Sequence, residues 1–176
     1  MQTADAFPFT ATLEESTNKL WGCHFGVPPL VADALIAQRE DRRVICNLNE
    51  KKQYQCAMLP RGNGTFLITV NKKIQKDLGL LIGSPVRVTL RQDESEYGLP
   101  MPEEFAEVLR QDPEGHRLFH ALTPGKLRTL LYIAGQVKSP DARIQRAMTI
   151  VEHLKANAGK VNYRQLGETM KANTLR

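Results

Sequence analysis

Apolar and polar residues alternate along five short stretches in the first half of the chain, and a sixth stretch, residues 20–27, is largely apolar. Alternation with a period of two is typical of β-strands that bury one face. The predicted strands span residues 7–13, 20–27, 44–48, 54–58, 66–70 and 86–90. Two short helices are predicted between them, at 30–38 and 72–78, the second with Asn71 as its N-cap and Gly79 as its left-handed C-terminal residue. The first half of the chain is therefore expected to be a mainly β unit.

Two polar stretches are expected to form turns. Residues 14–19 are almost entirely polar, and residues 60–64 contain Pro, Asn and two Gly. Pro, Asn and Gly favour tight turns because of their backbone preferences. We therefore expect 60–64 to join the strands 54–58 and 66–70 as a hairpin.

Two segments of this first half resemble each other. Three apolar residues of one match three of the other at a constant offset: Val27, Val31 and Leu35 correspond to Val70, Ile74 and Leu78. Three more match at an offset one residue shorter: Val44, Cys46 and Leu48 correspond to Val86, Val88 and Leu90. Each segment is a strand, a short helix and a strand, and neither has enough apolar surface to fold alone. We expect them to pair about a pseudo-two-fold axis into a closed or split barrel with a helix capping each end.

After the polar, Pro-containing stretch 93–102, the period of the apolar residues changes from two to 3.6, which is typical of helices. Helices are predicted at 103–111, 116–122, 124–137, 140–157 and 162–172. The fourth is expected to bury one apolar face, which comprises Ile144, Ala147, Met148, Val151 and Leu154. The sequence therefore predicts an α+β fold with two domains, residues 1–96 and residues 97–176.

Composition excludes several classes of protein. The chain is 41% hydrophobic and 24% charged, as is usual for globular proteins. No apolar run approaches the roughly 20 residues that span a bilayer. Its three cysteines lack the CxxC spacing of a zinc site or a disulfide framework. The first residues do not resemble a secretion signal, so we expect a cytoplasmic protein.

Positive charge is concentrated in the last third of the chain. Residues 116–176 carry 11 Lys and Arg against three Asp and Glu, a net charge of +8. Residues 99–115 carry one Arg against five Asp and Glu, a net charge of −4, whereas residues 1–98 are nearly balanced at +1. Such asymmetry suggests an anionic partner, although solvated helices often show it as well.

Two groups of basic residues are candidate anion sites. The first contains Lys72, Lys73 and Lys76 on the polar side of the helix 72–78, with Arg61 in the preceding hairpin. The second contains Lys138, Arg143 and Arg146 at the start of the helix 140–157. Basic side chains in either group could contact phosphates or carboxylates. The structural alternatives are a solvated helix face for the first group and, for the second, pairing with the acidic residues near the start of the helix 103–111.

Signals for catalysis or a bound metal are weak. His116 and His120 share a helix face and could reach one metal ion, but the sequence offers no third ligand. Trp21 with His24 and Phe25 is more easily explained as core packing than as a stacking platform. No nucleophile elbow, P-loop or close pair of carboxylates is present. No cofactor is therefore predicted, and a binding protein is favoured although the enzymatic status stays open.

The first half of the chain resembles a barrel family known as domain of unknown function 1905. The resemblance rests on Phe9-Thr10-Ala11-Thr12-Leu13, Val27-Pro28, Met58-Leu59-Pro60-x-Gly62-x-Gly64, Val70-Asn71-Lys72-x-Ile74-x-Lys76 and Gly79-x-x-x-Gly83. It implies a small double-split β-barrel. Ser84 stands where the family commonly has Asp, which leaves the fold expectation unchanged.

Residues 102 to about 155 resemble the bacteriocin-protection family, also called YdeI/OmpD-associated, which occurs in bacteria. The resemblance rests on Phe119-x-x-Leu122-x-Pro124 and Lys138-x-Pro140-x-x-Arg143-x-x-Arg146. It implies a helical domain but no activity. Gly125 and Tyr132 replace a common Ser and Trp of this family.

These observations together favour an uncharacterised, non-enzymatic binding or stress/bacteriocin-protection protein. Its partner would be anionic (nucleic acid, a nucleotide or an acidic protein surface) and would contact basic helices. One alternative is an enzyme or small-molecule binder with a pocket where the barrel and helical domains meet. Another is a DNA-binding regulator, by analogy with transition-state-regulator barrels. The sequence does not predict an oligomeric state.

Overall fold

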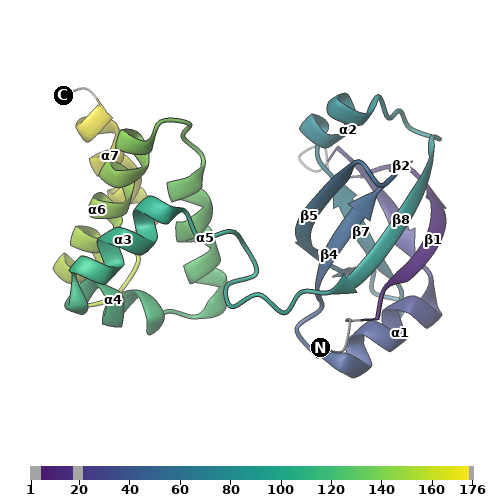
Figure 1. Cartoon of the computed structure of the whole chain (residues 1–176), viewed down its shortest axis with the longest axis horizontal. Coiled ribbons are helices and arrows are strands. Elements are labelled where there is room, and N and C mark those ends of the chain that lie inside the picture. The colour runs from purple at the N-terminus through teal and green to yellow at the C-terminus, as the bar shows by residue number, and fades with distance from the viewer. Residues whose placement is uncertain (1–4, 18–21, 175–176) are drawn as a thin grey trace. The chain divides into compact units, whose positions relative to one another are not determined.

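The computed structural model of the chain describes residues 5–17 and 22–174. The chain forms two compact units, residues 1–94 (the β unit) and residues 95–176 (the helical unit). Antiparallel strands make up the first unit and helices the second (Figure 1). The predicted α+β class is therefore confirmed.

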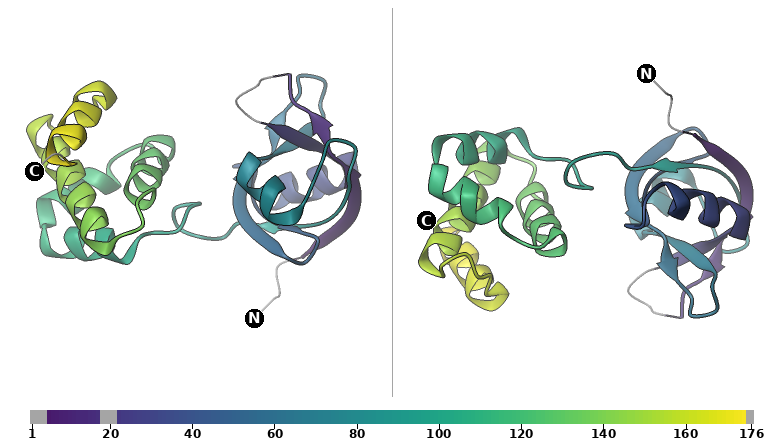
Figure 2. Two further views of the ribbon diagram at one scale, coloured as in Figure 1. Left: turned by 90° about the horizontal axis from the view of Figure 1, so that it is seen from above. Right: turned by 90° about the horizontal axis from the view of Figure 1, so that it is seen from below.

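The β unit contains two four-stranded antiparallel sheets. In one sheet the order is β1 (Phe7–Thr12), β8 (Pro85–Gln92), β4 (Arg43–Leu48) and β5 (Lys52–Ala57). In the other the order is β2 (Glu14–Glu15), β3 (Cys23–Val27), β7 (Phe66–Val70) and β6 (Leu59–Pro60). Helices α1 (Pro29–Gln38) and α2 (Lys72–Leu78) lie at opposite ends of this body (Figures 1 and 2). The pairing of the strands into two separate sheets thus corresponds to the split form of the predicted barrel.

The two similar segments pair with each other as predicted. Strand β3 pairs with β7, with Phe25 opposite Ile68 at the centre of the ladder. Strand β4 pairs with β8, with Cys46 opposite Leu90 at the centre of that ladder. Each segment therefore contributes one strand to each sheet, which is the arrangement that a pseudo-two-fold axis requires.

A single apolar core lies between the two sheets. Its largest side chains with almost no exposed surface are Leu13, Phe25, Leu35, Leu48, Met58, Ile68 and Leu90. The Tyr54 hydroxyl of β5 also donates a hydrogen bond to the Thr69 carbonyl of β7, at 3.3 Å, which links one sheet to the other. Burial of both inner faces explains why the strands alternate so regularly in sequence.

Local signals set the ends of α2 as expected. The Asn71 Oδ1 atom accepts a hydrogen bond from the Ile74 backbone N–H at 2.9 Å, which is N-cap geometry. Gly79 has φ of 64°, the left-handed conformation that ends a helix at little cost only when the residue is glycine. Both features were predicted from the sequence, and both are confirmed.

Two details of the β unit differ from the prediction. Glu14 and Glu15 form the short strand β2 instead of part of a turn, because they pair with Cys23 and His24 of β3. The strand predicted from residue 54 does not form the hairpin with β7, because the chain crosses between the sheets at the buried Met58. Of the predicted hairpin, only the two-residue β6 pairs with β7. Leu20 and Trp21, which were predicted to belong to the second strand, lie outside the described residues.

The helical unit has a separate core. Its helices are α3 (Glu103–Gln111), α4 (Pro113–His120), α5 (Pro124–Gly135), α6 (Pro140–Ala156) and α7 (Tyr163–Thr174). The core side chains with almost no exposed surface include Phe105, Phe119, Leu130, Leu131 and Ile150. Helix α6 contacts the other four helices and is the centre of the unit (Figure 2).

Two expectations for the helical unit are wrong. Helix α4 begins at Pro113, three residues before the predicted start, because Asp112 caps it by accepting from the Gly115 N–H at 2.8 Å. Ile144 and Met148 were expected in the core, but they are 40% and 55% exposed. The core face of α6 is rotated away from them, toward residues such as Ile150.

The described part of the chain contains no helix with the length and apolar content needed to cross a membrane. This finding agrees with the absence of a long apolar run in the sequence.

Candidate functional site

The basic residues singled out from the sequence fall into separate places. Lys72, Lys73 and Lys76 are exposed on α2, at one end of the β unit. Lys73 Nζ lies 2.7 Å from Asp77 Oδ2. The hydrogen bond from Lys73 lowers the pKa of Asp77 most, and the positive charges of Lys73, Lys52 and Lys76 lower it further. One carboxylate therefore lies among several lysines, and this group keeps a net positive charge.

Lys52 is a member of this group that sequence reasoning missed. It is the first residue of β5, twenty residues before α2, and it is close enough to Asp77 for its charge to lower the pKa of that carboxyl. The charged turn before β5 is visible in the sequence. Only the pairing of the strands shows at which end of the β unit this turn lies. We call Lys52, Lys72, Lys73 and Lys76 the lysine face.

Arg61 does not belong to the lysine face. Its Nη2 atom lies 2.9 Å from Glu14 Oε2 and 2.7 Å from His24 Nε2. The hydrogen bond from Arg61 is the main cause that lowers the pKa of Glu14. Arg61 follows β6 beside the start of β7, whereas α2 follows the end of β7, and the Arg61 guanidinium is engaged by Glu14 and His24 instead of joining the lysines.

Around His24 the structure shows a chain of polar contacts that the sequence did not reveal. Ser16 Oγ lies 2.9 Å from His24 Nδ1, and Glu14 Oε2 lies 3.1 Å from His24 Nε2. The order Ser–His–Glu is that of a hydrolase triad. However, Ser16 and His24 are both only 8% exposed, so the hydroxyl is not open to a substrate. His24 Nε2 is also engaged by Arg61, so this arrangement is structural.

Arg143 is held by three acceptors within the helical unit. Its Nε and Nη2 atoms each donate to a backbone carbonyl at 3.0 Å, those of Val137 and Lys138. Its Nη1 atom donates to Glu104 Oε1 at 2.9 Å. The Arg143 side chain is 31% exposed and that of Glu104 is 16% exposed. This guanidinium therefore fixes the α5–α6 loop to the start of α3.

Arg146 has a similar structural contact, whereas none is found for the Lys138 side chain among the residues that the structure describes. The Arg146 Nη1 atom donates to the Ile133 carbonyl in the last turn of α5, at 2.6 Å. A cation at the C-terminal end of α5 interacts favourably with the negative end of that helix dipole. Lys138 is exposed, and its carbonyl is one of the acceptors for Arg143. Arg143 thus has one of the acidic partners expected in the structural alternative to an anion site, whereas the acceptor of Arg146 is a backbone carbonyl.

Replacing Arg143 by methionine is expected to lower the free energy of unfolding of the helical unit by about 1–2 kcal/mol. Methionine keeps most of the aliphatic length but leaves two loop carbonyls and Glu104 without the guanidinium. Urea denaturation followed by circular dichroism at the helical band measures the change. Lys138→Met is the matched control and should change stability little, because that side chain is exposed. Equal effects of the two substitutions would contradict the structural role.

A pocket of about 520 Å³ lies beside Arg143 within the helical unit. Its lining includes Leu99, Met101, Glu103, Tyr132, Gln136 and Arg143. Tyr132 is 61% exposed. The pocket therefore offers an aromatic ring together with polar groups. Because Glu103 and Glu104 outnumber the one arginine in its lining, its charge does not favour an anion.

His116 and His120 stack instead of converging on a metal position. Their ring centroids are 4.1 Å apart. His120 Nδ1 donates to the His116 carbonyl at 2.8 Å, and its Nε2 lies 2.9 Å from the Tyr97 hydroxyl. Both nitrogens of His120 are therefore engaged. Among the residues that the structure describes, no group of three or more His, Cys, Asp or Glu could hold a metal ion.

The fold thus defines a two-part α+β protein with a basic face on its β unit. Two protein-family models match it in succession. Residues 9–90 match the family described as a domain of unknown function (DUF1905), and residues 99–157 match the family described as Bacteriocin-protection, YdeI or OmpD-Associated. These matches confirm both resemblances and their order. A comparison with curated proteins gave no match.

Proposed function

We propose that this chain is a non-enzymatic binding protein that engages a nucleic acid through the lysine face of α2. The observation that carries the proposal is the group of four lysines at one end of the β unit, of which Lys52, Lys73 and Lys76 lie around a single carboxylate, Asp77. Lys72, Lys73 and Lys76 are exposed. The family matches name no ligand or reaction, so the proposal depends on this geometry.

Long lysine side chains on a short rigid helix suit a row of phosphates. Lys72 and Lys76 are four residues apart, so they lie one helical turn from each other on the same side. Lys73 also contacts Asp77, but an exposed pair of this kind is weak and exchanges readily with another anion. Contacts of this type give affinity without sequence specificity, because they address the phosphate backbone.

The helical unit supports the same partner at longer range. Its last 61 residues carry a net charge of +8. Arg143 and Arg146 are engaged with internal acceptors. Exposed lysines remain on α5, the following loops and α7: Lys126, Lys138, Lys160 and Lys171. Charge distributed in this way raises the rate of association with a polyanion.

The test replaces Lys72, Lys73 and Lys76 by glutamine together. Fluorescence anisotropy with a short labelled DNA duplex measures the association constant at several salt concentrations. Each lost phosphate contact lowers the slope of log K against log salt by about 0.9. We therefore expect a slope smaller by about 2–3 than that of the wild type, and binding at low salt weaker by roughly tenfold or more.

A triple replacement of Lys126, Lys160 and Lys171 by glutamine is the matched control, because it removes the same charge from exposed positions in the helical unit. It should reduce the slope much less than the α2 variant. Equal losses in both variants would mean that only net charge matters, and would overturn the proposed site. Absence of binding to DNA and RNA at low salt would overturn the proposed partner.

A further inference from the structure

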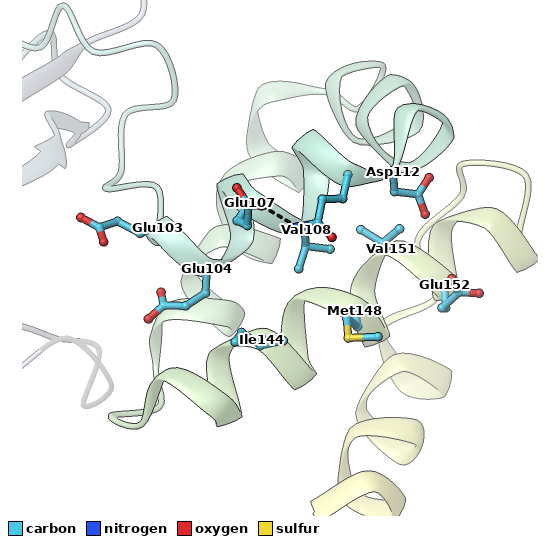
Figure 3. Close-up of a pocket in the computed structure, with 10 residues that line it drawn as sticks. Glu103, Glu104, Glu107, Val108, Asp112, Ile144, Met148, Val151 and Glu152 are labelled. Atoms are coloured by element: carbon cyan, nitrogen blue, oxygen red, sulfur yellow. Dashed lines mark hydrogen bonds between the residues drawn. The ribbon is translucent and has the colours of Figure 1, made fainter.

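A groove of about 550 Å³ runs between α3 and α6 (Figure 3). Three residues of its lining, Ile144, Met148 and Val151, belong to the face of α6 that was expected to be buried. Its floor is apolar and consists of Val108, Ile144, Met148 and Val151. Its rim carries five carboxylates: Glu103, Glu104, Glu107, Asp112 and Glu152. The described lining of the groove contains no lysine or arginine.

The floor exposes apolar surface that the helical unit does not cover. Ile144 is 40% exposed and Met148 is 55% exposed, although Ala147 and Val151 beside them are buried. Contiguous apolar surface between polar walls is typical of a site that another molecule covers. Methionine in particular adapts its shape to different partners because its side chain is unbranched and flexible.

Three carboxylates of the rim, those of Glu104, Glu107 and Asp112, have lowered pKa values and stay ionised near neutral pH. Hydrogen bonds from Arg110 and then Gln111 lower the pKa of Glu107 to about 2. A hydrogen bond from Lys155 is the main cause that lowers the pKa of Asp112. Asp112 and Glu152 share this one lysine.

The rim also carries more negative than positive charge. Glu104 and Glu107 have one arginine each. No ion pair of Glu103 is found within the described part of the chain. Five carboxylates against three cations leave a net charge of −2 at the rim.

The carboxylates are distributed along the whole groove. Figure 3 shows Glu103 and Glu104 near one end, Asp112 and Glu152 near the other, and Glu107 between them. Eight residues separate Glu104 from Asp112 along α3, which corresponds to about 12 Å at 1.5 Å per residue. A docked helix of two to three turns has that length. Its apolar residues at i, i+3, i+4 and i+7 would then face the floor.

We propose that the groove binds a cationic amphipathic helix of a protein partner. Apolar side chains of that helix cover Ile144 and Met148, and its lysines or arginines pair with the rim. The occupant follows from charge complementarity, because the rim is acidic and the floor is apolar. The same rim repels phosphates, so this site is separate from the lysine face.

The probe is a synthetic helix of leucine and lysine with one apolar face, and isothermal titration calorimetry measures its binding to the full chain. Ile144→Lys with Met148→Lys places positive charge on the floor and is expected to weaken binding at least tenfold. Leu81→Lys with Ile82→Lys is the matched control, since these β-unit residues are 74% and 60% exposed, and it should leave binding unchanged. Glu103→Gln changes only one charge of the rim and is expected to weaken binding more modestly.

Three results would overturn the proposal. The first is equal binding by the floor variant and its control. The second is equally strong binding of the same peptide with glutamate in place of every lysine. The third is a wild-type dimer, detected by light scattering, that becomes monomeric in the Ile144→Lys and Met148→Lys variant, because a second copy of the chain would then occupy the groove.

Discussion

Replacing Phe25 by alanine is expected to lower the free energy of unfolding of the β unit by about 3–5 kcal/mol. Phe25 is 0% exposed and lies opposite Ile68, which is also 0% exposed, at the centre of the β3–β7 ladder. Its ring also lies 6.2 Å from that of Phe9. Alanine would therefore leave a cavity where the two similar segments meet. Urea denaturation followed by the fluorescence of Trp21, the single tryptophan of the chain, measures the loss.

Leu81→Ala is the control for Phe25→Ala. Leu81 belongs to the same unit but is 74% exposed, so its truncation should change the free energy of unfolding by less than about 0.5 kcal/mol. A loss for Phe25→Ala as small as that of the control would show that the two segments do not share a core at this position.

The second large effect is expected for Gly115→Ala in α4, with a loss of about 2–3 kcal/mol in the helical unit. A Cβ atom at Gly115 would overlap the side chain of Val151 on α6. Val151 is 2% exposed, so the Val151 side chain, α4 or α6 must shift to make room for the Cβ atom. Thermal unfolding followed by circular dichroism at the helical band reports the change.

Gly167→Ala in α7 distinguishes this steric effect from the helix propensity of alanine. A Cβ atom at Gly167 would meet nothing within 4 Å. Alanine there should raise the free energy of unfolding by about 0.5–1 kcal/mol, because it favours a helix more than glycine does. If Gly115→Ala stabilised the protein to the same extent, the close approach of α4 to α6 would be refuted.

Much of the fold follows from the sequence because the two patterns used to predict it both reflect burial. These are the period-two alternation of strands and the 3.6-residue period of helices. The alternation of Val86, Val88 and Leu90 has one explanation, a strand with one face in the core, and all three are buried. The ends of α2 follow from Asn71 and Gly79, whose effects are local. The pairing of similar segments follows from their internal repeat.

Features that depend on packing between elements could not be predicted in this way. Ile144 and Met148 share the helical period of the buried residues of α6, but the period does not say how wide a stripe the neighbouring helices cover. Similarly, Met58 has the alternation of a strand residue, whereas the chain changes sheets there.

The candidate sites were predicted less well for the same reason. Residue type and spacing drew attention to Arg143 and offered an acidic partner on the helix 103–111, but the two loop carbonyls that it also contacts are known only from the fold. Lys52 lies outside the helix that carries the other lysines, so no local motif connects it to them. The charge of the sequence thus suggests which kind of partner binds, whereas the position of the binding site depends on the tertiary structure.

The most direct test of the lysine face is an amide chemical-shift titration of the full chain with a short DNA duplex at low salt. The account predicts that the largest shifts fall on α2 and the start of β5, around Lys52 and residues 71–79. Shifts confined to residues 95–176, or shifts of similar size over the whole chain, would contradict it.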